Sequence, residues 1–289
     1  MLKTGIISTA YFGFKNFEQG MKKCRAHGYD GIDYQEFVSV ENSPIYKMKE
    51  GEAERYFTEL KDCADTNGLE IYQLHGAWPH VDDRTKEGRE RTIEYFKQNI
   101  LGAEILGCPK VIVHPCMPRL GLGNAVEEED FEVNAYLLKS LAPFAREHSV
   151  TVCFENMPFV VGSLFSKVSN IKKLMAEIRD PNIKVCLDTG HFNVEKKDIC
   201  EAITLLGDDL ATLHVHDDRF GQDRHLLPFQ GEIDWSGFVR GLRNISYKGF
   251  ISLETSIQQS TPEPMLEEMR ISLAKIAKWF AAQVDDEQV

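Results

Sequence analysis

The sequence alternates short apolar stretches with longer amphipathic ones eight times in succession. Short apolar runs bounded by turn residues are typical of buried strands, and apolar residues recurring once per turn indicate helices. The expected strands are residues 3–8, 29–34, 69–75, 110–114, 150–155, 183–188, 210–216 and 249–254. The expected helices are residues 17–27, 52–67, 86–106, 127–147, 168–179, 198–206, 235–244 and 264–282.

Most of these strands are apolar on both faces, as parallel strands covered by helices are. Eight strand–helix units in sequence predict an α/β fold, a closed (β/α)8 TIM barrel, with residues 1–289 as one domain. An open doubly wound sheet is the alternative. The first expected strand is not followed by the Gly-rich phosphate loop that a dinucleotide-binding sheet would carry, which favours the barrel.

Six consecutive strands end in residues that bind metals. These residues are His75, His114, Glu155, Asp188, His214 and Glu254. The carboxyl ends of barrel strands meet on one face, which carries the chemistry in this fold. His191 follows the sixth strand closely, and Asp223 and His225 lie in the seventh loop.

Glu155, Asp188 and Glu254 each follow an apolar run, so their carboxylates are expected to be buried. Three buried carboxylates on one rim repel one another unless a cation lies between them. We therefore predict a divalent metal ion bound by these three residues and His214.

The remaining candidates are open to two interpretations, metal ligation or a structural or substrate-binding role. They are His75, His114, His191, His216, Asp223 and His225. His214 and His216 stand two residues apart on an expected strand, which predicts that they share a face.

The composition restricts which binding partners and which cellular compartment we expect. The formal net charge is −12, which disfavours nucleic acid as a main partner. The seven cysteines form no CxxC pair, and the N-terminus leads directly into a strand pattern without a targeting segment. No apolar run approaches the length of a membrane span. These features predict a cytoplasmic protein with reduced thiols.

Five stretches together resemble a known superfamily. They are Phe154-Glu155-Asn156, Leu187-Asp188-Thr189-Gly190-His191, His214-Val215-His216-Asp217-Asp218, Leu253-Glu254-Thr255 and residues 223–235, which begin Asp-Arg-His and end Ile-Asp-Trp. In this order they resemble the xylose isomerase-like TIM-barrel superfamily, and residues 223–235 look like its sugar phosphate isomerase/epimerase branch.

The resemblance implies an enzyme of carbohydrate metabolism that uses Mn²⁺, Mg²⁺, Co²⁺ or Zn²⁺. It implies isomerisation or epimerisation of a sugar, or of a sugar phosphate, by proton transfer next to a carbonyl. Glu155 and Glu254 would then be metal ligands that also exchange the proton, and His191 would orient a substrate oxygen. Relatives are often dimers or tetramers, so a homo-oligomer is left open.

Three alternatives remain open. A lyase resembling inosose dehydratase or a C-glycoside-cleaving enzyme would use the same metal and proton abstraction. A sugar-binding barrel without turnover would have no reason to keep a full metal shell. The third alternative is an abasic-site nuclease of the endonuclease IV type.

The nine-ligand pattern of the endonuclease IV nucleases is matched in full by His75, His114, Glu155, Asp188, His191, His214, Asp223, His225 and Glu254. The net charge of −12 favours a small carbohydrate substrate over DNA. One bound metal would indicate the sugar enzyme, and three would indicate the nuclease.

Aromatic residues in the first and third loops suit a sugar ring. We expect Tyr11, Phe12 and Trp78 to line the substrate pocket. Arg219, just beyond the seventh strand, is expected either to contact a substrate hydroxyl or phosphate or to form a surface ion pair.

Overall fold

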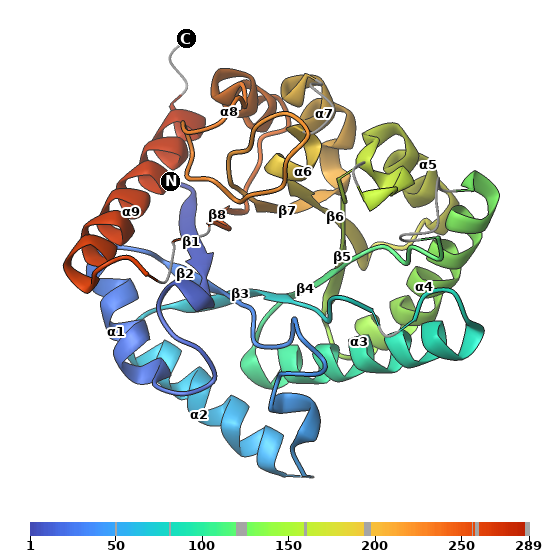
Figure 1. The fold of residues 1–289 in the computed structure, drawn as a ribbon, viewed down its shortest axis with the longest axis horizontal. Helices are drawn as coiled ribbons and strands as arrows, with labels where there is room; N and C mark the ends of the chain where they lie inside the picture. The colour runs from blue at the N-terminus through green and yellow to red at the C-terminus, as the bar shows by residue number, and fades with distance from the viewer. Residues whose placement is uncertain are drawn as a thin grey trace.

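The computed structural model describes residues 1–49, 51–80, 82–119, 126–158, 161–193, 198–255, 257 and 260–286. Eight parallel strands form one sheet that curls into a nearly closed barrel (Figure 1). They are β1 (Lys3–Ile7), β2 (Gly31–Tyr34), β3 (Glu70–His75), β4 (Lys110–Val113), β5 (Thr151–Glu155), β6 (Ile183–Asp188), β7 (Leu210–His214) and β8 (Phe250–Leu253). The predicted TIM-barrel fold is confirmed, whereas one domain over residues 1–289 remains a prediction.

The seam of the barrel lies between β7 and β8. Every other neighbouring pair of strands is joined by a parallel ladder, in the order β7-β6-β5-β4-β3-β2-β1-β8. β7 and β8 meet through a single parallel bridge between Val215 and Leu253. The Val215 amide donates to the Ser252 carbonyl at 2.7 Å, and the Glu254 amide donates to the Val215 carbonyl at 3.0 Å.

Helices surround the barrel (Figure 1). They are α1 (Phe17–His27), α2 (Glu52–Thr66), α3 (Lys86–Leu106), α4 (Glu127–Glu147), α5 (Val168–Ile178), α6 (Thr189–Asn193), α7 (Ile199–Leu206), α8 (Trp235–Asn244) and α9 (Glu263–Asp285). Their ends follow local chemistry: the Thr85 hydroxyl accepts from the Gly88 amide at the start of α3, and Gly107 ends that helix with φ 66°. Within the described ranges, every helix is too short or too polar to cross a bilayer.

Two shifts of register orient side chains in the barrel. Between β2 and β3, Ile32 pairs with Ile71 but Asp33 pairs with Gln73, so Tyr72 is skipped. Between β6 and β7, Val185 pairs with Leu210 but Cys186 pairs with Thr212. A bulge of this kind changes which side chains stand opposite each other. The second shift places Asp188 opposite His214.

The structure departs from the sequence-based expectation after β6 and β7. Thr189–Asn193 form a short helix, α6, that was not expected. β7 ends at His214 rather than at His216, because the chain leaves the sheet after the single bridge to β8. The alternation rule for strands therefore does not extend to His216.

Candidate functional site

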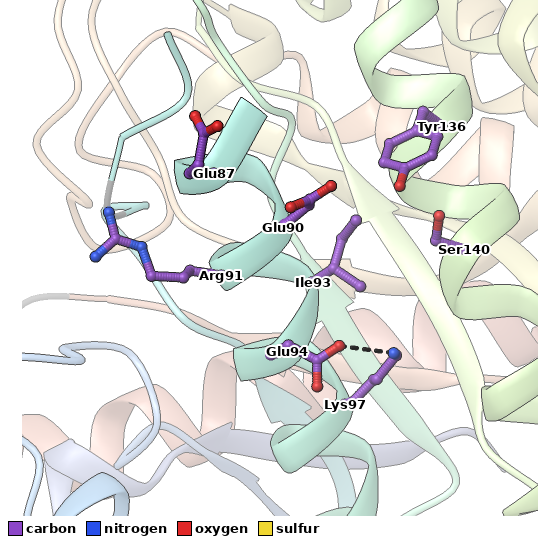
Figure 2. Close-up of a pocket in the computed structure, with 8 residues that line it drawn as sticks. All are labelled: Glu87, Glu90, Arg91, Ile93, Glu94, Lys97, Tyr136 and Ser140. Carbon is purple, nitrogen blue, oxygen red and sulfur yellow. Dashed lines mark hydrogen bonds and ion pairs between the residues drawn. The ribbon is translucent and has the colours of Figure 1, made fainter. Parts of the chain in front are cut away.

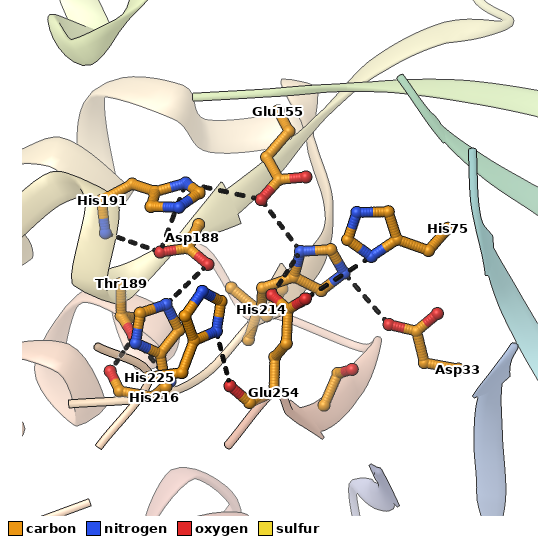
Figure 3. Close-up of polar contacts among 12 residues, drawn as sticks. Asp33, His75, Glu155, Asp188, Thr189, His191, His214, His216, His225 and Glu254 are labelled. Atoms are coloured by element: carbon orange, nitrogen blue, oxygen red, sulfur yellow. Dashed lines mark hydrogen bonds and ion pairs between the residues drawn. The ribbon is translucent and has the colours of Figure 1, made fainter. Parts of the chain in front are cut away.

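Histidines and carboxylates from several strands converge at the carboxyl ends of the barrel strands (Figure 3). The six predicted strand-end residues are all buried, with at most 6% of any one exposed. Parallel strands bring their carboxyl ends to one face, so side chains far apart in the sequence meet there.

His214 lies between two glutamates (Figure 3). Its Nδ1 is 3.0 Å from Glu155 Oε1 and 3.1 Å from Glu254 Oε2. Glu155 ends β5, and Glu254 directly follows β8. The carboxylates thus approach one nitrogen from opposite sides of the β7 strand end.

Asp188 organises the adjoining part of the site. Its Oδ1 accepts from the His191 amide at 2.6 Å, so the side chain caps the short helix α6. Its Oδ2 lies 2.9 Å from His216 Nε2. The Asn156 side chain continues the β5–β6 pairing by accepting from the Asp188 amide at 2.7 Å. These contacts hold the Asp188 carboxylate in one orientation.

His75 and His114 stack in line with His214. The His75 ring lies 4.9 Å from each of the other two rings, centroid to centroid. His114 Nε2 is 3.3 Å from Glu155 Oε2, and Trp78 packs on His114 at 4.8 Å. The structure therefore places His75, His114 and Trp78 beside Glu155 and His214, and their roles remain predictions.

A second group adjoins Asp188. His191, His216, Asp223 and His225 each offer a ligand atom, and all four atoms lie within 4.8 Å of one another. The His216 and His225 rings stack at 4.0 Å. His214 and His216 thus serve different parts of the cluster, although they are two residues apart.

The pKa values of the histidines reflect the negative charge of the carboxylates around them. Burial lowers the pKa of His191, but the charge of Asp188 and the hydrogen bond to Asp223 outweigh burial and raise the pKa to about 10. Burial and the neighbouring His214 hold the pKa of His75 well below its usual range. The carboxylates therefore recruit protons onto selected histidines.

The residues present suit a divalent cation. Glu155 Oε2 and Glu254 Oε2 are buried and lie near histidine nitrogens, but within the described part of the chain they accept no hydrogen bond. Buried carboxylate oxygens without donors are costly unless a cation lies beside them. The carboxylates of Glu155, Asp188 and Glu254 and the imidazole of His214 form a donor set that divalent metals accept.

Sequence reasoning missed Asp33 and Gln35. Asp33 is buried on β2, and its Oδ2 lies 3.1 Å from His214 Nε2. The Gln35 amide nitrogen donates to Glu254 Oε1 at 3.0 Å and lies 3.2 Å from His75 Nδ1. The signal available in the sequence was one acidic residue inside a short strand that carries no other charged residue.

Asp217 organises the loop that carries Asp223 and His225. Its Oδ1 accepts from the Asp218 and Ile233 amides at 2.9 and 3.2 Å, and its Oδ2 accepts from Trp235 Nε1 at 3.1 Å. These bonds join the end of β7 to the start of α8 and so fix the base of the loop.

Tyr11 and Phe12, expected to line the substrate pocket, contact α1 instead, and Arg219, for which a substrate contact or a surface ion pair was left open, lies on the surface. The Tyr11 hydroxyl lies 2.8 Å from His27 Nδ1 on α1, and Phe12 is buried in the core against α1, where Gly20 leaves it room. Arg219 is exposed, and its amide donates to the Asp218 carboxylate. None of the contacts described for these three residues reaches the histidine cluster. Tyr11 and Phe12 pack on α1, and Arg219 belongs to the seventh loop.

A hollow of about 630 Å³ between α3 and α4 lies outside this site (Figure 2). It is lined by Glu87, Glu90, Arg91, Ile93, Glu94, Lys97, Tyr136 and Ser140. Glu94 pairs with Lys97 at 2.7 Å along the same helix. The hollow lies between surface helices and not at the strand ends, so we do not assign the chemistry to it.

Replacing Gly190 with alanine is expected to lower the free energy of unfolding by about 1–3 kcal/mol, the usual cost of overpacking. An added Cβ would lie 1.9 Å from His216 Cε1, and the ring cannot retreat because His225 stacks on it. Urea unfolding measures the loss. Gly13→Ala is the matched control, since its Cβ would meet nothing closer than 3.6 Å. Equal stability of both variants would contradict the close packing of His216.

The chain is similar to known proteins in both sequence and structure. A family model described as xylose isomerase-like TIM barrel matches residues 21–276. A D-psicose 3-epimerase from Enterocloster bolteae is 24% identical over 253 residues, which are 85% of this chain and 79% of that protein. A probable endonuclease 4 from Solibacter usitatus is 31% identical over 193 residues, which are 59% of this chain and 64% of that one.

A solved structure of D-psicose 3-epimerase in the presence of D-fructose superposes with a TM-score of 0.80 at 16% identity. The match covers 96% of this chain and 99% of that chain. At this identity the likeness shows the fold, and the site chemistry has to be argued from the residues themselves.

Proposed function

Because the chain belongs to the xylose isomerase-like TIM-barrel family, we propose that it is a divalent-metal-dependent carbohydrate isomerase or epimerase. The observation that carries the proposal is the convergence of Glu155, at the end of β5, and Glu254, just after β8, on His214 Nδ1. The D-psicose 3-epimerase relative supports epimerisation next to a carbonyl as the finer assignment.

The proposed chemistry is a proton transfer shared by two carboxylates. Glu155 removes the proton from the carbon next to the substrate carbonyl, and the C–H electron pair moves toward the carbonyl oxygen. The electron pair then returns from the oxygen to the carbon as protonated Glu254 gives its proton to the other face, which inverts that carbon. Proton exchange with water restores the Glu155 carboxylate and the Glu254 acid for the next turnover. In the reverse direction the two residues exchange roles, so no oxidant or reductant is needed.

Glu155, Asp188, His214 and Glu254 would hold the metal ion. When bound, the ion supplies Lewis acidity that stabilises negative charge on the substrate oxygens. Mn²⁺, Mg²⁺, Co²⁺ and Zn²⁺ all accept this donor set. His191 and Trp78 are proposed to orient the substrate, since both lie at the edge of the cluster.

The charges around the cluster support an uncharged sugar as substrate. Among the described residues, the cluster carboxylates form ion pairs with histidines only. The histidines of the cluster are already paired with these carboxylates, so a phosphorylated sugar would need a further cationic partner, and Arg219 is exposed. We therefore propose a free ketose. All seven cysteines are free thiols, in keeping with the proposed cytoplasmic location.

The proposal is tested by incubating the Mn²⁺- or Co²⁺-loaded protein with D-fructose, D-tagatose, D-psicose and L-ribulose in D₂O. Epimerisation through the two carboxylates places deuterium on the inverted carbon, which proton NMR detects. Loss of a substituent from the product would instead indicate a lyase. An isomerised product without solvent deuterium would contradict proton transfer.

A nuclease is the second candidate, because the full nine-residue set is present and the probable endonuclease 4 relative shares 31% identity. The groups His75–His114–Glu155 and His191–Asp223–His225 each bring their ligand atoms within 4.8 Å. Elemental analysis of the purified protein together with an abasic-site nicking assay separates the candidates. One metal per chain without nicking supports the sugar enzyme, and three zincs with nicking support the nuclease.

A further inference from the structure

Asp33 lies directly behind the imidazole of His214 (Figure 3). It is fully buried on β2, and its Oδ2 lies 3.1 Å from His214 Nε2. The opposite nitrogen of the same ring faces Glu155 and Glu254. Asp33 thus contacts the ring on the side away from the two glutamates.

An imidazole can bind a metal only through a nitrogen that carries no hydrogen. The ring is held in the required tautomer when its other N–H donates to a carboxylate, which also makes the ligand more basic. His214 Nε2 has such an acceptor in Asp33 Oδ2. This contact leaves the Nδ1 lone pair directed at the space between the glutamates.

Asp33 is itself held by a network inside the barrel. The Gln73 amide nitrogen donates to Asp33 Oδ2 at 2.9 Å and to Ser252 Oγ at 3.2 Å. The Thr212 hydroxyl donates to the Gln73 amide oxygen, which fixes which end of the amide faces Asp33. The skipped residue between β2 and β3 is what sets Gln73 opposite Asp33.

From these contacts we propose that Asp33 is a positioning residue. It fixes the tautomer and orientation of His214, and Gln73 holds Asp33 in place. The inference rests on the proposed function, because it assumes that His214 binds the metal ion. A buried carboxylate with only a structural role would affect folding and leave metal affinity unchanged.

The test is the Mn²⁺ affinity of Asp33→Asn, measured by calorimetry on the metal-free protein. The amide keeps the shape but loses the charge and also offers a donor to His214. Loss of such an outer partner typically weakens metal binding about 10–100-fold, and this is the expected result. The Co²⁺ absorption spectrum, which reports the ligand set, is expected to change as well.

Asp130→Asn is the matched control, since Asp130 is also buried but accepts from the Val126 amide at the start of α4. It is expected to bind Mn²⁺ as the wild type does. Gln73→Met is the second variant, which keeps Asp33 and removes its donor, and it is expected to weaken binding by a smaller factor.

The outcomes separate the inference from the proposed function. A wild-type protein that binds no Mn²⁺ or Co²⁺ overturns both. A wild type that binds, with Asp33→Asn within twofold of it, overturns the role of Asp33 alone. If Asp33→Asn does not fold, Gln73→Met decides, and an unchanged affinity in that variant overturns the inference.

Discussion

Replacing Glu155 with glutamine is expected to lower kcat by about 10²- to 10⁴-fold, the range of a lost general base. The amide keeps the volume of the side chain, so the barrel should remain folded. The far-UV circular dichroism and the unfolding midpoint should stay near those of the wild type. Steady-state turnover of the best ketose, with metal content measured on the same sample, checks the prediction.

Glu254→Gln tests the roles of the two glutamates separately, because each carboxylate is assigned to one face of the substrate carbon. This variant should lose epimerisation but still exchange solvent deuterium into the one epimer that presents its proton to Glu155. Glu177→Gln is the control, since Glu177 is exposed and pairs with Lys139 on the surface. Normal turnover by Glu155→Gln would show that the proposed roles are wrong.

The second large effect is the pH dependence of metal binding. Burial lowers the pKa of His214, but the Cys186 thiol and the carboxylates of Glu254 and Glu155 outweigh burial and hold the pKa well above its usual value. His191, whose pKa is raised to about 10, also carries a proton at neutral pH in the metal-free protein. Binding of the ion must displace the proton of His214, and it weakens the attraction between Asp188 and His191.

Metal affinity is therefore expected to fall as the pH falls, because acidification favours the protonated histidines, which compete with binding of the ion. Each displaced proton changes the apparent affinity about tenfold per pH unit, so the loss between pH 8 and pH 6 is expected to reach roughly 10²- to 10⁴-fold. Calorimetry of Mn²⁺ binding in two buffers with different ionisation enthalpies counts the protons released. An affinity that is independent of pH over this range would contradict the assigned protonation states.

The sequence was sufficient to predict the barrel and the gathering of the strand-end histidines and carboxylates for a physical reason. Parallel strands buried on both faces are mostly apolar, so a run of histidines and carboxylates at successive strand ends stands out, and all such ends share one rim. His75, Glu155 and Asp188 could therefore be placed together although they are far apart in the chain. Their metal ligation stays a proposal, since burial and proximity alone do not establish it.

Other parts of the site depend on features that a pattern does not carry. Asp33 was missed because its contact with His214 joins β2 to β7 across the barrel interior, and the local pattern reports neither register nor direction. Tyr11 was assigned to the substrate from its type and its loop, but its hydroxyl binds His27 on α1. The sequence shows that the residue is aromatic, but tertiary packing determines where its ring points.

The seam between β7 and β8 has a consequence for stability. His214 ends one strand and Glu254 follows the other, while His225 Nδ1 donates to the Glu254 carbonyl at 3.0 Å across the same gap. An ion held by His214 and Glu254 would cross-link the two edges of the sheet where a single backbone bridge now joins them. Ring closure and ion binding would then be thermodynamically linked, so the free-ion concentration would set how firmly the last strand is held.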